Sequence, residues 1–214
     1  MHSTEMVPLT TLPELLTFTL LSTTTWLTLH LYVHRNGPIP LTRSVAKLNN
    51  RFYAAISLAM FLTVTLQTTK TAGDDSQIRY IYHLSKLYEF IDILLVCASG
   101  GPISLHFGFH HLTTPYLTFI RYLSGSEHWG VFAALNTFHH VLMYAYFGGA
   151  VFLRPILPWS GMLQLVGGLV VDLMLGIEAY TTGEDGEVWP YLGSGMLLGV
   201  YFILNWRDLR ARRV

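Results

Sequence analysis

The chain has 214 residues, carries no net charge, and is 51% hydrophobic but only 12% charged. Soluble domains average about 25% charged residues, so this composition excludes an ordinary water-soluble protein and favours one that lies in lipid. With no net charge, the chain has no overall field that would attract nucleic acid, and we expect no nucleic-acid partner.

Long apolar runs separated by short polar segments predict an all-α integral membrane protein. A bilayer span needs about 20 mostly apolar residues. We predict seven transmembrane helices in a single membrane domain, residues 1–214, with spans near 14–33, 52–69, 79–98, 103–123, 130–150, 160–180 and 188–206. The first run follows acidic residues and has no small-residue cleavage site, so we expect a retained helix there and not a signal peptide.

The distribution of charge predicts how these spans are oriented. Basic residues that follow the first span, lie between the fifth and sixth, and close the chain are Arg35, Arg43, Lys47, Arg51, Arg154, Arg207, Arg210, Arg212 and Arg213. Acidic residues in the alternate loops are Asp74, Asp75, Glu184, Asp185 and Glu187. By the positive-inside rule, the N-terminus of this multi-pass protein is lumenal or outside and the C-terminus is cytosolic.

Three ionisable residues share one face of the third span. At about 100° per residue, Lys86, Glu89 and Asp92 stay within a stripe of about 120°. Ionisable groups at membrane depth are costly unless they are paired or face a cavity, so they indicate function. A structural ion pair between Lys86 and Glu89 that fixes the helix register is an equally good explanation.

The fourth span holds three histidines within six residues. His106 and His110 stack on one face, and His111 lies about 100° further round. A lone buried histidine is usually a hydrogen-bonded core residue. Three of them at membrane depth are hard to explain by packing and predict a functional site.

A second polar row follows on the fifth span. Asn136, His140 and Tyr144 recur every four residues, with Met143 beside them, whereas His139 points about 100° away. One face of this helix therefore carries an amide, an imidazole and a phenol. The alternative is a helix–helix interface held by polar side chains.

Further polar residues of the sixth span lie near the same depth. Gln164 and Asp172 can line one cavity; the alternative is that Asp172 simply meets Lys86 or a backbone group. The single cysteine, Cys97, excludes an internal disulfide and a cysteine-rich zinc site.

Clustered imidazoles have two main chemical uses, as metal ligands or as nucleophiles and bases toward an activated acyl group. The stretch from His106 to His111 matches the His-x-x-x-His-His spacing of di-iron membrane hydroxylases and desaturases. Such enzymes need about eight histidines for two octahedral metals. Four of the ten histidines, His2, His30, His34 and His128, fall near the ends of spans or outside them, and the remaining six are too few for two metals, so we expect no metal site.

The residues around the histidines form three motifs in sequence. These are Lys86-Leu-Tyr-Glu89-Phe-Ile-Asp92, then Phe109-His110-His111, then His140-Val-Leu-Met143-Tyr144-Ala-Tyr146-Phe147 preceded by Asn136, with Gln164 downstream. In type and order they resemble the Lys-x-x-Glu-x-x-Asp motif, the end of the histidine box, and the His-x-x-Met-Tyr motif of the fatty-acid elongase family. The resemblance covers roughly residues 80 to 210.

The resemblance implies a fold and an activity. The family consists of membrane 3-ketoacyl-CoA synthases of the endoplasmic reticulum, so helices two to seven would form a bundle around an intramembrane tunnel. His110 would attack an acyl-CoA thioester, and the resulting acyl-imidazole would accept the carbanion formed by decarboxylation of malonyl-CoA. No cofactor is implied beyond these two substrates, and the implied partners are the lipid bilayer and other enzymes of the pathway.

The same resemblance assigns roles to the neighbouring residues. His111 and His140 would orient the imidazole and assist proton transfer, while Tyr144 and Asn136 would stabilise the developing enolate or oxyanion. The residues expected to support this site are Lys86, Glu89, Asp92, His106, Met143 and Gln164.

The chain also departs from the family pattern. His106 lies one residue further from His110 than the family's first histidine, no Arg-Lys-Lys patch follows Asp92, and Gly161 and Gly167 occupy the threonine and second glutamine positions. Three alternatives therefore stay open. They are an elongase-fold enzyme diverted to a secondary-metabolite, polyketide or lipid tailoring step with histidine acid–base chemistry, a di-iron hydroxylase or desaturase, and a non-catalytic subunit.

Overall fold

The computed structural model of the chain describes residues 8–68, 75–124, 129–183 and 185–211. Regular structure in these ranges is entirely helical, which confirms the all-α class. The helices are α1 (Leu12–Asn36), α2 (Thr42–Thr68), α3 (Ser76–Tyr88), α4 (Phe90–Ala98), α5 (Leu105–Ser124), α6 (Trp129–Phe147), the 3-10 turn η1 (Val151–Leu153), α7 (Leu157–Thr182) and α8 (Asp185–Ala211). Asp74, Glu184, Arg212 and Arg213, which were used to predict the orientation, lie outside the described residues.

The helices coincide with the predicted spans. Glu89 alone separates α3 from α4, and together they occupy the position of the third span. Among the described residues, α7 and the Val188–Ala211 part of α8 are long and apolar enough to cross a membrane. The seven crossings themselves stay a prediction.

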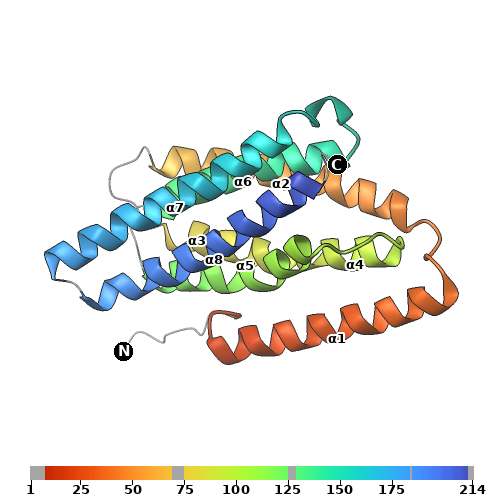
Figure 1. Cartoon of the computed structure of the whole chain (residues 1–214), viewed down its shortest axis with the longest axis horizontal. Helices are drawn as coiled ribbons and strands as arrows, with labels where there is room; N and C mark the ends of the chain where they lie inside the picture. The colour runs from red at the N-terminus through yellow and green to blue at the C-terminus, as the bar shows by residue number, and fades with distance from the viewer. Residues whose placement is uncertain (1–7, 69–74, 125–128, 184, 212–214) are drawn as a thin grey trace.

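Contacts between the helices form a closed cycle around an interior (Figure 1). Helix α2 packs on α6, α6 on α7, α7 on α8, α8 on α5, α5 on α3, and both α3 and α4 pack on α2. Helix α1 lies outside this cycle, against α4 and α5, at the lower edge of Figure 1. Helices α2 to α8, with α3 and α4 counted together, therefore enclose a common interior. This interior holds the candidate site.

Local sequence signals set the ends of the longest helices. Thr11 caps α1 through a capping box with Glu14, and α1 ends at Gly37 with a φ of 83°. Helix α7 has a proline in its first turn and ends at Gly183, whose left-handed backbone suits glycine. Both helices therefore begin and end where the sequence itself favours a boundary.

The outer surface exposes many large apolar side chains, and the interior holds polar and charged side chains among apolar ones, unlike a water-soluble domain. Apolar residues exposed along α7 include Leu163, Val166, Val170, Leu173 and Ile177. Buried polar residues include Lys86, Glu89, Asn136, His140, Gln164 and Asp172. Such a surface suits contact with lipid, and such an interior suits chemistry on a sequestered substrate.

Gly168 allows α7 to approach α6 and α8 closely. A methyl group on Gly168 would lie 2.7 Å from Phe132 Cδ2 and 2.9 Å from Leu198 Cδ1. We expect Gly168→Ala to lower the free energy of unfolding by about 1–3 kcal/mol because the core must repack, measured by thermal unfolding in detergent. Gly199→Ala is the matched control, since nothing lies within 4 Å of a methyl group there. Equal losses in the two variants would contradict the close-approach role.

Candidate active site

Two rows of polar side chains meet between the α3–α4 rod and α6. We call these six residues the polar seam: Lys86, Glu89, Asp92, Asn136, His140 and Tyr144. The rows run in parallel, so that Lys86 meets Asn136, Glu89 meets His140, and Asp92 meets Tyr144. All are buried except Asp92, which is half-buried. The seam thus joins the two helix faces that sequence periodicity selected.

A buried ion pair lies at the centre of the seam. Lys86 Nζ is 2.6 Å from Glu89 Oε1, and their side chains are 0% and 1% exposed. Tyr53 of α2 donates its hydroxyl to the Ser85 carbonyl at 2.8 Å and to the same Glu89 oxygen at 3.3 Å. Glu89 Oε2 is buried without a hydrogen-bond partner among the described residues. Lys86 and Tyr53 therefore both bind the same carboxylate oxygen of Glu89, Oε1.

Asn136 uses all of its hydrogen-bonding capacity within the protein. Its Oδ1 accepts from Lys86 Nζ at 2.6 Å and from the Tyr82 hydroxyl at 2.9 Å. Its Nδ2 donates to Gln164 Oε1 at 2.9 Å and to His140 Nε2 at 3.4 Å. An Nε2 that accepts leaves the proton of neutral His140 on Nδ1, which lies 3.1 Å from Glu89 Oε1. Asn136 therefore selects the tautomer of His140.

Tyr144 is bound to Asp92 at the other end of the seam. Its hydroxyl donates to Asp92 Oδ2, and Asn49 Nδ2 donates to Asp92 Oδ1 at 3.5 Å. The Tyr144 ring packs edge-on against Tyr53, with centroids 4.5 Å apart. The phenol proton therefore faces a carboxylate in this structure. Met143 is half-buried next to Tyr144 along α6.

The two adjacent histidines of α5 each have one nitrogen assigned by a neighbour. His111 Nδ1 lies 2.9 Å from the Glu89 carbonyl, which can only accept, so this nitrogen carries the proton and Nε2 keeps its lone pair. His110 Nδ1 lies 3.3 Å from the hydroxyl oxygen of Thr114, whose proton goes to the His110 carbonyl. The Thr114 oxygen therefore accepts the Nδ1 proton of His110, and Nε2 keeps the lone pair.

A cavity lies beside His110 with room for about one water molecule. We call it the histidine cavity. Polar residues in its wall are Tyr82, His110, Thr114, Asn136, Gln164 and Tyr201, and apolar ones are Leu117, Phe132, Leu165 and Leu198. The ring of Tyr201 packs against that of His110, with centroids 4.8 Å apart. His110 is thus the histidine that this wall contains.

Other histidines of the cluster have different neighbours. The rings of His106 and His110 lie edge to face, with centroids 5.8 Å apart. His139 Nδ1 is 2.9 Å from Ser160 Oγ, so His139 contacts α7, and its ring centroid is 6.1 Å from that of His140. His83 bridges Thr118 and the Leu9 carbonyl. The described residues contain no group of three or more His, Cys, Asp or Glu side chains placed to hold a metal ion.

The alternative contact of Asp172 with Lys86 is wrong. Asp172 pairs with Arg121 of α5 and accepts from Ser194 of α8. It follows Gln164 by eight residues, which is roughly 12 Å along a helix, and it is absent from the wall of the histidine cavity that Gln164 lines. Gln164 does line the histidine cavity.

Sequence reasoning missed Tyr53, Thr114, Arg121 and Tyr201. For Tyr201 a signal was available, because Tyr191, Ser194, Leu198 and Tyr201 recur at helical spacing and are all buried on one face of α8. Tyr53 gave no such signal, since its partners are a carbonyl and a carboxylate of another helix.

Comparisons with known proteins bear on this site. A family model described as ELO, the GNS1/SUR4 family, matches residues 9–207. Fatty acid elongase 2 of Trypanosoma brucei brucei is 31% identical over 141 residues, which cover 61% of this chain and 52% of that protein. Fatty acid elongase A of Dictyostelium discoideum is 32% identical over 132 residues, covering 53% and 47%. Very long chain fatty acid elongase 5 of Mus musculus is 28% identical over 168 residues, covering 69% and 54%.

The chain spans about half the length of the curated relatives it matches. No solved structure matches it.

Proposed function

Because the chain belongs to the ELO (GNS1/SUR4) family, we propose that it is a membrane-embedded condensing enzyme that joins an acyl-CoA and malonyl-CoA. The observation that carries the proposal is the placement of His110. It lies in the wall of an interior cavity, and its Nδ1 faces a hydroxyl that leaves Nε2 with the lone pair. An imidazole nitrogen with a lone pair in a water-poor site is suited to attack a thioester.

The first half-reaction transfers the acyl group to the protein. His110 Nε2 attacks the thioester carbonyl, the carbon–sulfur bond breaks, and CoA leaves as a thiolate that takes up a proton. In the second half-reaction malonyl-CoA loses carbon dioxide, and the electron pair left on carbon attacks the acyl carbonyl. The imidazole leaves with its lone pair, and the product is a 3-ketoacyl-CoA longer by two carbons.

We assign the stabilisation of the developing oxyanion to a different donor from the two that the sequence suggested. Asn136 and Tyr144 both have protein partners, so we give them positioning roles: Asn136 orients His140, and Tyr144 holds Asp92. Gln164 lines the histidine cavity, and its Oε1 already accepts from Asn136. Its amide NH2 is therefore the donor available on that side of the cavity.

His111 and the remaining seam residues support His110. His111, held by the Glu89 carbonyl, and His140, which accepts from Asn136 and lies beside Glu89, are placed for proton transfer. Lys86 and Glu89 hold the α3–α4 rod against α6 through Asn136 and His140. His106 lies against His110, and Met143 lies next to Tyr144 along α6; we assign neither a step.

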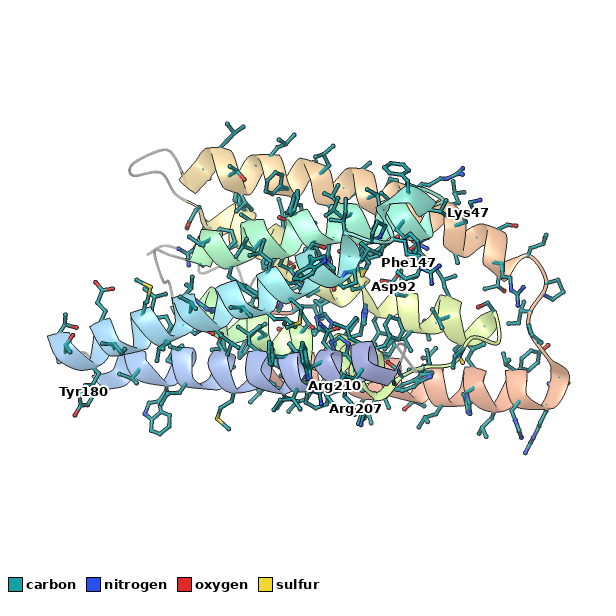
Figure 2. All side chains as sticks on the ribbon, turned by 45° about the horizontal axis from the view of Figure 1, so that its top comes forward. Lys47, Asp92, Phe147, Tyr180, Arg207 and Arg210 are labelled. Carbon is teal, nitrogen blue, oxygen red and sulfur yellow. The ribbon has the colours of Figure 1, made fainter. Side chains whose placement is uncertain are left out.

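We also propose that the protein lies in the endoplasmic reticulum membrane with a lumenal N-terminus and a cytosolic C-terminus. Figure 2 supports the orientation, because Lys47, Arg207 and Arg210 lie away from the end of α7 that carries Tyr180. Arginine and lysine residues that gather toward one side are typical of the cytosolic face.

Intact-mass spectrometry of the purified protein tests the proposed function. Incubation with an acyl-CoA alone is expected to add the mass of one acyl group, and later addition of malonyl-CoA is expected to remove it and yield a 3-ketoacyl-CoA. The adduct is expected to form equally after treatment with a metal chelator. Cys97→Ser removes the only cysteine and should still form the adduct, which distinguishes an imidazole adduct from a thioester. An unchanged mass across acyl chains of varied length would refute the proposal.

A further inference from the structure

A second cavity lies further toward the C-terminal end of α5 than the histidine cavity, and we call it the distal cavity. Its wall consists of Arg79, Tyr82, Thr118, Arg121, Trp129 and Phe132, and it also has room for about one water molecule. Tyr82 and Phe132 belong to the walls of both cavities. The two cavities are therefore neighbours, separated by these side chains, and the distal one holds two guanidinium groups.

Arg79 brings more donors to the distal cavity than its neighbours can accept. Its Nε donates to Asp75 Oδ1 at 2.7 Å, and its guanidinium lies over the Trp129 ring at 5.1 Å. The side chain is 9% exposed, and Nη1 is buried without a hydrogen-bond partner among the described residues. Asp75 Oδ2 already accepts from Trp129 Nε1 at 2.6 Å. The unmet need at this position is for an acceptor.

Charge is nevertheless balanced around the cavity. Burial alone would raise the pKa of the Asp75 carboxyl, but hydrogen bonds from Arg79 and Trp129 outweigh burial and lower the pKa, which keeps Asp75 ionised beside Arg79. Arg121 pairs with Asp172, and its Nε donates to Ser194 Oγ at 3.2 Å. Each arginine therefore has its own carboxylate, so the cavity favours a neutral oxygen over an anion.

The distance between the cavities suits a chain that starts at His110. From His110 to Thr118 and Arg121 is eight and eleven residues of α5, or roughly 12 and 16 Å at 1.5 Å per residue. An extended chain advances roughly 1.2 Å per bond, so an acyl group of about ten to fourteen carbons would place its far end between the two arginines. A plain methyl end there would leave Arg79 Nη1 without an acceptor.

We propose that the distal cavity binds a neutral oxygen, a hydroxyl or a carbonyl, at the far end of a medium-length acyl chain attached at His110. This inference rests on the proposed function for the identity of the chain. It makes oxygenated acyl groups the preferred substrates, with Arg79 as the residue that recognises the oxygen. Phe132 and Tyr82 must move apart to admit the chain, since the free space in each cavity is small.

Binding of a matched pair of ligands tests the inference. ω-Hydroxydodecanoyl-CoA and tridecanoyl-CoA have equally long chains and differ only in a hydroxyl or a methyl at the end. We expect the full-length protein in detergent to bind the hydroxylated compound at least about tenfold more tightly. The affinity is obtained from the rise in unfolding temperature as the ligand concentration increases. Equal affinity, or no binding of either, would overturn the inference. Acyl adducts formed equally with both ligands would retain the proposed function while excluding the preference.

A pair of variants separates recognition from a merely structural role. Arg79→Met is expected to bring the affinity ratio of the two ligands close to one by weakening the hydroxylated ligand alone. Arg154→Met removes an exposed arginine that belongs to the wall of neither cavity, and the ratio is expected to stay as in the unmodified protein. Loss of affinity for both ligands in parallel in Arg79→Met would show that Arg79 only supports the fold. If Arg79→Met does not fold, the ligand comparison in the unmodified protein decides the question.

Discussion

His110→Ala is expected to abolish both the acyl adduct and 3-ketoacyl-CoA formation, with the rate falling by at least about a thousandfold. Removal of a nucleophile eliminates the covalent route altogether, and neighbouring groups cannot replace it. His111 is the nearest candidate, but its Nδ1 is bound to the Glu89 carbonyl and the residue is absent from the wall of the histidine cavity as described. Intact mass and product analysis with malonyl-CoA measure the two losses separately.

His139→Ala is the matched control for this variant. His139 is also a histidine on a long interior helix, but its ring contacts Ser160 and lies beside Gly161. We expect the adduct to form at close to the normal rate. Retained adduct formation in His110→Ala, or its loss in both variants alike, would move the nucleophile to another residue and contradict the mechanism.

Glu89→Gln is expected to lower the free energy of unfolding by about 3–5 kcal/mol, because it leaves the Lys86 ammonium buried without its carboxylate. The single, buried cysteine provides the measurement. Cys97 is 3% exposed, so a thiol-reactive dye reports unfolding as the temperature rises. Glu178→Gln removes an exposed carboxylate of α7 and should change the unfolding temperature little.

The double variant Lys86→Met/Glu89→Gln completes the test. It removes both charges, so we expect it to regain much of the stability that Glu89→Gln loses. It should not regain activity, because Asn136 then lacks its bond from Lys86 and His140 lacks the Glu89 carboxylate. A double variant as unstable as the single one would show that hydrogen bonds, and not the buried charge, dominate the energetics of the pair.

Much of the architecture could be predicted from the sequence because hydrophobic length and helical period are local properties. The runs of apolar residues located the long helices, and the four-residue spacing of Asn136, His140 and Tyr144 selected the buried face of α6. The family motifs then named the residues that the structure brings together as the polar seam.

Features that depend on the neighbouring helix could not be predicted in this way. The break at Glu89 between α3 and α4 has no glycine or proline to mark it. The partner of Asp172 depends on the depth at which α5 and α7 pack, and spacing within α7 alone cannot give that depth. Tyr53 reaches the seam from α2, which carries none of the family motifs.

The break at Glu89 has a further effect on how the site tolerates change. The carbonyl that binds His111 Nδ1 is part of the main chain, so every amino acid at position 89 would supply it. The orientation of His111 is therefore insulated from replacement of the Glu89 side chain, whereas that of His140 is not. Substitutions at position 89 can therefore change the surroundings of His140 while the imidazole of His111 keeps its alignment.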